Sequence, residues 1–244
     1  MIVLISVNKK KGVYMKVAIT IDVDWAPDKV LEHTLKLFSK AGVPCTIFAT
    51  HRTSLLSGLD QKQFEIGVHP NFNPLFDGDK RHPVDVVAPL REAFPGAMGI
   101  RSHSSLVSNV LVEMFGEMGF QYESNICLPY SKKLEVLPLW NGMMRIPFNW
   151  EDYLHFSFGK SFRDADLDFS EGLHILNFHP VHIFLNTETR ERYEGARPFY
   201  QDPEHLYGYR NLGRGTATLL EGLLMKNYPF VKLEDIFHEQ KVEI

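Results

Sequence analysis

Short apolar runs recur along the chain, and several of them end at or just before a polar residue. The first run, 17–23, is rich in β-branched residues, which favour strands. Later runs resemble it and lie far enough apart to leave room for helices between them. We predict strands at 17–23, 45–49, 64–68, 98–100, 144–147, 173–178 and 230–233.

Apolar residues between these runs recur at helical spacing. In 28–41 the apolar positions are Val30, Leu31, Leu35, Leu37 and Phe38, and Gly42 follows as a stop signal. We predict helices at 28–41, 107–118 and 216–226. Strands that alternate with helices are typical of a parallel sheet with covering helices, either open or closed into a barrel. No linker or fixed repeat divides the chain, so we expect a single domain.

Polar side chains gather where the predicted strands end. They are Asp22 and Asp24, His51, His69, Arg101 and His179. Because parallel strands present their C-terminal ends at one edge, where α/β enzymes build active sites, we expect these residues to form one site.

Asp22 and Asp24 form an Asp-x-Asp pair at the end of the first strand. The two-residue period of a strand points both carboxylates to the same side. Two close carboxylates are costly unless a cation lies between them or one takes a proton. The pair therefore indicates a base beside a metal ligand; a helix N-cap or a solvated loop is the alternative interpretation.

Four short motifs then carry a family resemblance. They are T-I-D-V-D at 20–24, E-I-G-V-H at 65–69, G-I-R at 99–101 and H-I-L-N-F-H-P at 174–180. In this order they resemble the polysaccharide deacetylase family, also called the NodB-homology or carbohydrate esterase four family. The similarity spans roughly 16–237, and the chain resembles the divergent deacetylase-like proteins encoded with O-antigen and capsule genes more than the secreted chitin deacetylases.

The resemblance implies a single-domain α/β fold, a deformed (β/α) barrel of TIM-like type. It also implies one divalent metal ion, zinc first and otherwise nickel, cobalt, iron or manganese. Such enzymes hydrolyse the acetamide of an N-acetylated sugar. Carried over by motif, the general base is Asp22, the metal ligands include Asp24 and His69, Arg101 orients the base, and His179 is the general acid.

The chain departs from the family pattern at one metal ligand. The second metal histidine is expected at position 73, where Asn73 stands. If a helix begins at Pro70, His69 and Asn73 share a face and Asn73 can serve as a ligand. Otherwise His103 or His51 supplies the third ligand, and Asn73 is a turn residue.

Substrate contacts have no decisive signature. The candidates are Trp25, His51, Trp150, Asp152 and His182, and Tyr153 and Trp140 are further aromatic candidates, although such aromatics can equally be ordinary packing. We expect rim loops at 145–153 and 187–209. The stretch 187–211 fits a substrate lid or an oligomer contact equally well, and the sequence leaves the oligomeric state open.

Charge and cysteine content narrow the class of partner. A net charge of −4 and a pI near 6.3 argue against a nucleic-acid surface. Cys45 and Cys127 form no C-x-x-C motif and fit a reducing compartment, with a single disulfide as the alternative.

The start of the chain stands apart from these patterns. Its apolar run at 2–7 is too short to span a bilayer, and its lysines follow the run, unlike those of a signal peptide. We expect 1–14 to be an extension outside the fold, 15–244 to be the catalytic domain, no membrane span, and a cytoplasmic location.

Two classes of function remain. The first is a metal-dependent hydrolase that removes an N-acetyl group from a lipid-linked or nucleotide-linked amino sugar during surface polysaccharide biosynthesis. The second is a catalytically impaired carbohydrate-binding or regulatory pseudoenzyme on the same fold, which the missing histidine would explain. Hydrolysis of another C–N bond, such as that of a cyclic imide, is a further alternative.

Overall fold

The computed structural model describes residues 15–163, 167, 169 and 171–241. The expected extension at 1–14 lies outside these residues. Within them, ten strands form one sheet. The strands are β1 (Lys16–Asp22), β2 (Cys45–Ala49), β3 (Phe64–Val68), β4 (Gly99–Ile100), β5 (Tyr122–Glu123), β6 (Leu137–Pro138), β7 (Met144–Arg145), β8 (Trp150–Glu151), β9 (Leu173–Phe178) and β10 (Phe230–Val231).

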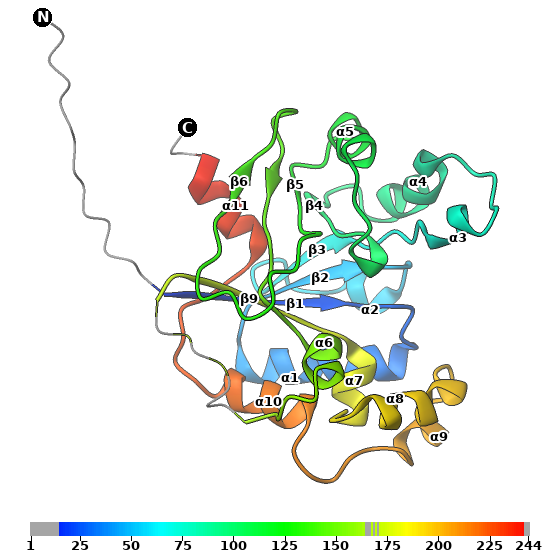
Figure 1. The fold of residues 1–244 in the computed structure, drawn as a ribbon, viewed down its shortest axis with the longest axis vertical. Coiled ribbons are helices and arrows are strands. Elements are labelled where there is room, and N and C mark those ends of the chain that lie inside the picture. Colours follow the sequence, from blue (N-terminus) through cyan, green and yellow to red (C-terminus); the bar gives the residue numbers. More distant parts are fainter. Residues whose placement is uncertain (1–14, 164–166, 168, 170, 242–244) are drawn as a thin grey trace, which may run out of the picture.

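Helices cover both sides of this sheet; Figure 1 shows α1 and α10 on one side of β1, and α4, α5 and α11 on the other. The helices are α1 (Asp28–Ala41), α2 (Ser54–Ser57), α3 (Asn73–Phe76), α4 (Pro83–Ala93), η1 (His103–Ser105), α5 (Asn109–Glu117), α6 (Asp152–Ser157), α7 (Pro180–Leu185), α8 (Arg190–Ala196), η3 (Arg197–Phe199), α9 (Pro203–Tyr207), α10 (Thr216–Leu224) and α11 (Leu233–Lys241). No helix in the described part of the chain is long and apolar enough to cross a membrane.

The sheet runs in the order β6-β7-β5-β4-β3-β2-β1-β9-β8, and β10 pairs with the start of β1. Every pair of neighbours is parallel except β6 and β7. The sheet curls and is flanked by helices, which confirms the predicted deformed (β/α) barrel. Because β1 lies between β2 and β9 and is parallel to both, the C-terminal ends of these three strands lie at the same edge of the sheet.

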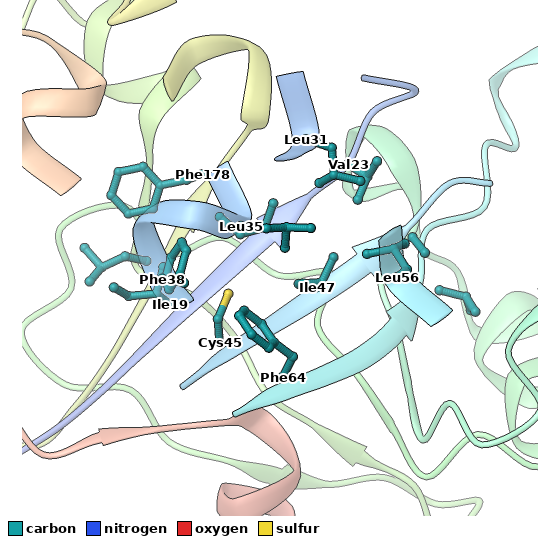
Figure 2. Packing of buried hydrophobic residues seen from close by; sticks show 14 of the residues in the cluster. Ile19, Val23, Leu31, Leu35, Phe38, Cys45, Ile47, Leu56, Phe64 and Phe178 are labelled. Atoms are coloured by element: carbon teal, nitrogen blue, oxygen red, sulfur yellow. The ribbon is translucent and has the colours of Figure 1, made fainter. Parts of the chain in front are cut away.

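The core forms where the sheet meets α1. Leu31, Leu35 and Phe38 of α1 pack toward apolar side chains of the strands, including Ile19 and Ile47 (Figure 2). All five side chains are buried. The apolar face of α1 thus holds β1 and β2 in place, and this packing also fixes the position of the carboxylates at the end of β1.

The long periodic elements match their predictions. Helix 28–41 and strands 45–49, 64–68 and 173–178 have the predicted bounds. Gly42 ends α1 in a left-handed conformation (φ 65°), with its N–H bonded to the Phe38 carbonyl.

The prediction of a loop at 187–209 is wrong, because this stretch contains α8, η3 and α9. The side chains of Thr189 and Asp202 cap α8 and α9, accepting backbone N–H bonds from their first turns. Helices this short show little periodicity, so their caps were the only signal in the sequence. The stretch 145–153, also predicted as a loop, includes β8 and the start of α6.

Candidate active site and metal centre

The C-terminal ends of β1, β3, β4 and β9, called the rim below, bring the predicted residues together. Asp22, Asp24, His69 and His179 line one cavity of about 530 Å³, and Arg101 lies directly behind Asp22. The structure thus brings Asp22, Asp24, His69, Arg101 and His179 to one site, whereas His51, expected with them, is not among the described residues that line the cavity.

Asp22 is a buried carboxylate held at both oxygens. Its Oδ1 accepts a hydrogen bond from Arg101 Nη1 at 3.1 Å, and its Oδ2 accepts one from Asn177 Nδ2 at 2.8 Å. Burial raises the pKa of the Asp22 carboxyl, but the charge of Arg101, with His69 and His179, outweighs burial and leaves that pKa below its ordinary value. Asp22 is therefore an ionised group in a fixed orientation, as a general base requires.

Arg101 is almost fully buried, and its guanidinium lies between two phenyl rings. The centroids of Phe48 and Phe148 are 4.4 and 4.5 Å from its Cζ. It also donates hydrogen bonds to Ser124 and Thr20. These contacts fix the guanidinium in place beside the Asp22 carboxylate, with which it forms an ion pair.

Asp24 lies just beyond β1 and meets two imidazoles. Its Oδ1 is 3.1 Å from His69 Nε2 and 3.0 Å from His103 Nδ1. Burial alone would raise the pKa of Asp24, but hydrogen bonds from His103 and His69 hold that pKa well below its ordinary value. Burial likewise opposes charge on His103, yet the bond to Asp24 raises the pKa of His103 above its ordinary value.

This group of three fits a divalent metal. Its ligand atoms lie within 4.8 Å of one another, and one carboxylate with two imidazoles is a common ligand set for catalytic zinc. Zinc bonds of about 2.0 to 2.2 Å in a tetrahedron separate neighbouring ligand atoms by roughly 3.3 to 3.6 Å. His69 points its Nε2 at Asp24 and its Nδ1 toward Asp22, whose Oδ1 is 3.9 Å away, so this ring lies between the base and the metal group.

Asn73 is not among the described residues that line the cavity. The prediction that His69 and Asn73 share one helical face is wrong, because α3 begins only at Asn73 and residues 69–72 are not helical. The Asn73 side-chain amide donates instead to Ser104 Oγ at 3.0 Å. Asn73 therefore braces the loop that carries His103, and of the alternatives at this position the structure favours His103.

The turns beside both candidate ligands have unusual backbone conformations. Asp24 and Trp25 have φ values of 48° and 56°, and Ser104 and Ser105, directly after His103, have 58° and 53°. Left-handed conformations are disfavoured for residues with a Cβ atom, and more so for a bulky one. Such strain persists only where surrounding contacts enforce it, and it is often found at functional sites.

His179 faces this group from the end of β9. Its Nε2 is 3.8 Å from Asp24 Oδ2, and its Nδ1 donates to Asp152 Oδ1 at 2.7 Å. Burial disfavours the charged ring, yet Asp152 raises the pKa of His179 well above its ordinary value. His179 is thus held as a proton donor, which suits the predicted general acid.

Asp152 was predicted to contact the substrate, but it is not among the described residues that line the cavity. It is fully buried behind His179, and its Oδ2 also accepts the His179 backbone N–H at 2.8 Å. The adjacent Glu151 lines the cavity, and burial raises the pKa of Glu151 to about 7.

His182 also lines the cavity, with its ring centroid 5.5 Å from that of His179. Burial lowers the pKa of His182 to about 4, so the ring is neutral. Together with Asp152 and His179 it forms a second group whose atoms could hold a metal. Both Asp152 oxygens already accept hydrogen bonds, from the Tyr153 and His179 backbone N–H groups and from the His179 ring, so this group is the poorer metal site.

The other predicted substrate contacts have mixed positions. Trp25 is partly exposed, with its ring edge-on to His103 at 5.2 Å. Trp150 is buried, packs on Phe178 and donates to His155 Nδ1, so it faces away from the cavity. His51 is not among the described residues that line the cavity; its Nδ1 is 3.0 Å from Thr50 Oγ1.

Several cavity residues were not singled out from the sequence. They come from η1, the loop after β5 and the α8–η3 segment, and they are Ser104, Ser105, Cys127, Tyr193, Glu194, Arg197 and Tyr200. Nothing in their spacing marks them, because their segments reach the rim only through tertiary packing.

A family model described as WbmS-like polysaccharide deacetylase matches residues 19–197. The chain is similar to a Bordetella bronchiseptica protein described as a candidate polysaccharide deacetylase involved in O-antigen biosynthesis. The identity is 37% and the TM-score 0.81, over 86% of this chain and 90% of that one. A candidate polysaccharide deacetylase from Mycobacterium smegmatis shares the fold with 16% identity and a TM-score of 0.61, over 96% of this chain and 92% of that one. The comparison with curated proteins gave no match.

Proposed function

The chain belongs to the WbmS-like polysaccharide deacetylase family, and we propose that it is a metal-dependent hydrolase that removes the N-acetyl group of an amino sugar. The observation that carries this proposal is the arrangement of three functions around one cavity. Asp22 is an ionised base, Asp24 with His69 and His103 forms the metal group, and His179 is a protonated acid.

In this proposal Asp24, His69 and His103 would hold the metal. A divalent ion bound there would lower the pKa of a water molecule and polarise the acetyl carbonyl. The missing histidine at position 73 is then no loss of a ligand, since His103 supplies a second imidazole from a different loop.

The residues of the chain account for the proton transfers. Asp22 takes a proton from the attacking water while Arg101 and Asn177 keep its carboxylate oriented. The water oxygen forms the new bond to the acetyl carbon, and the C–N bond breaks. His179 gives its proton to the leaving nitrogen, and Asp152 stabilises the charged ring beforehand. The products are acetate and a free amino sugar.

The cavity supports a sugar as substrate. Tyr153, Tyr193 and Tyr200 line it, and aromatic rings with polar tips suit the mixed apolar and hydroxyl surface of a sugar. By analogy with the relative described in O-antigen biosynthesis, we propose a lipid-linked or nucleotide-linked N-acetylated sugar used in surface polysaccharide synthesis. Both cysteines are free, in keeping with a reaction in the cytoplasm.

Metal content and acetate release test this proposal together. Protein purified without chelator should contain near-stoichiometric zinc, nickel, cobalt, iron or manganese by elemental analysis, and an Asp24→Ala/His69→Ala variant should contain none. Asp22→Asn should keep the metal and lose about 10²- to 10⁴-fold in the rate of acetate release from an N-acetyl sugar, since a general base contributes that much.

The two readouts separate the alternatives. Metal-free protein that binds no added divalent ion would overturn the hydrolase and favour the carbohydrate-binding pseudoenzyme. Metal retained in the Asp24→Ala/His69→Ala variant would place the ion elsewhere and contradict the site described above.

A further inference from the structure

The backbone turn that carries Asp24 is held from outside β1. Val23 to Ala26 form a tight turn in which the Ala26 N–H bonds to the Val23 carbonyl at 2.9 Å. Both central residues, Asp24 and Trp25, have positive φ. Turns of this kind favour glycine, asparagine or aspartate, so a tryptophan at the second position needs outside support.

That support comes from residues that follow η3. Tyr200 donates its hydroxyl to the Asp24 carbonyl at 2.7 Å, and Gln201 Nε2 donates to the Trp25 carbonyl at 3.0 Å. On the other side, the Trp25 N–H donates to Thr50 Oγ1 at 2.9 Å. The carbonyls of both strained residues are therefore occupied by side chains located about 176 positions later in the chain.

The segment that supplies these contacts is itself well fixed. Phe199 stacks between His205 and Tyr209, with ring centroids 5.5 Å away in each case. Arg192 pairs with Glu188 and donates to the Tyr209 carbonyl. Tyr200 and Gln201 are thus presented to the turn by a firm support.

We propose that Tyr200 and Gln201 are positioning residues, called the clamp below, which lock the Asp24 turn so that its carboxylate faces His69 and His103. The inference rests on the metal centre proposed above. The clamp also joins that centre to the wall of the cavity, because Tyr193, Glu194 and Arg197 of the same segment line it. Because the backbone of Asp24 is already held in place, less conformational entropy is lost when Asp24 binds the metal.

Metal affinity tests the clamp directly. Tyr200→Phe removes one hydroxyl and keeps the ring, and Gln201→Leu removes the second bond. Each variant of the full chain, stripped of metal, is titrated with Co²⁺ against a chromophoric chelator, and the visible spectrum of the bound ion is recorded. We expect the Kd for Co²⁺ to rise about 10-fold in each variant, in the range found for partners that orient metal ligands, and the spectrum to change.

A matched control comes from the same segment. Tyr207 is exposed, with 61% of its surface accessible, so Tyr207→Phe should leave the Kd and the spectrum unchanged. Thermal unfolding of each metal-free variant reports on folding independently, and Gln201→Leu tests the clamp if Tyr200→Phe folds poorly.

The outcomes separate the clamp from the metal centre. If wild-type protein binds Co²⁺ and both clamp variants bind it equally well with an unchanged spectrum, the clamp is overturned and the metal centre stands. If wild-type protein binds no divalent ion, the proposed metal centre and the clamp both fail.

Discussion

Carboxylates are buried at both ends of the central strands, but their pKa values are shifted in opposite directions. At the rim, Asp22 and Asp24 have lowered pKa values. Near the start of β3, Glu65 is equally buried, yet burial raises the pKa of Glu65 to about 7. Burial is thus common to both ends and cannot by itself explain the difference.

The difference lies in the partners. Glu65 accepts hydrogen bonds from neutral groups only, which are the hydroxyls of Thr46 and Tyr122 and the backbone N–H of Glu234. Asp22 instead faces the guanidinium of Arg101. Neutral donors offset part of the desolvation penalty, whereas a full positive charge reverses it. At the rim, the buried Asp22 carboxylate stays ionised and can act as a base because the Arg101 cation lies beside it.

Removing an imidazole from Asp24 should have the largest effect at the rim. We expect His103→Ala to abolish retention of the metal, because only one carboxylate and one imidazole of the group would remain. Asn73→Ala should keep the metal, since Asn73 contacts Ser104 and lies outside the group. Elemental analysis of both variants decides the matter. Loss of the metal from Asn73→Ala, with retention in His103→Ala, would show that residue 73 is the ligand, as in the family pattern.

Removing the cation should make the rim resemble the Glu65 end. Arg101→Met leaves Asp22 buried without its charge partner, and we expect a loss of about 3 to 5 kcal/mol in the free energy of unfolding. Urea unfolding at neutral pH measures this loss. Adding Asp22→Asn to Arg101→Met should recover part of it, because the second change removes the unpaired charge. A double variant no more stable than Arg101→Met would show that Arg101 acts mainly through its packing between phenyl rings.

The smallest expected effect concerns Glu65 and the dependence of the free energy of unfolding on pH. Its pKa in the folded protein, about 7, lies above the ordinary 4.5. The protonated form that the fold favours is therefore fully present below pH about 4.5, and its contribution to stability is lost as the pH rises through about 7. Glu65→Gln, which stays neutral, should match wild type near pH 4.5 and be more stable by about 3 kcal/mol at pH 8.

Urea midpoints measured across this pH range give the difference between the two proteins. A difference that does not change with pH would mean that the pKa of Glu65 is the same in the folded and unfolded chains. The contrast between the two ends of the strands would then collapse.

The residues that sequence alone located are those that end a regular strand. Asp22, His69, Arg101 and His179 follow runs whose period and length are local properties, so their common edge could be deduced. The fold class followed from the same runs. Asn177 offered a similar signal, since it is a polar residue in a buried strand and shares a face with His179.

The rest of the site depends on contacts between distant segments. His103 could be proposed as a ligand but not preferred to Asn73, because the choice depends on where α3 begins. The role of Asp152 behind His179 depends on how β8 pairs with β9. Tyr193 and Tyr200 reach the cavity from short helices whose own sequence carries almost no periodic signal. In each case tertiary packing decides, and local propensity does not.

The central position of β1 also has a consequence for the order in which the chain acquires its site. A chain leaving the ribosome exposes β1 first, yet β1 pairs with β9, and Asp22 waits for a partner 155 positions later. Contacts this distant form late. The growing chain therefore carries Asp22 and Asp24 at the end of β1 long before Asn177 is made. Asp24, His69 and His103 all precede the clamp in the chain, so we expect a chain that stops between His103 and Tyr200 to bind the ion more weakly than one in which the clamp holds the Asp24 turn.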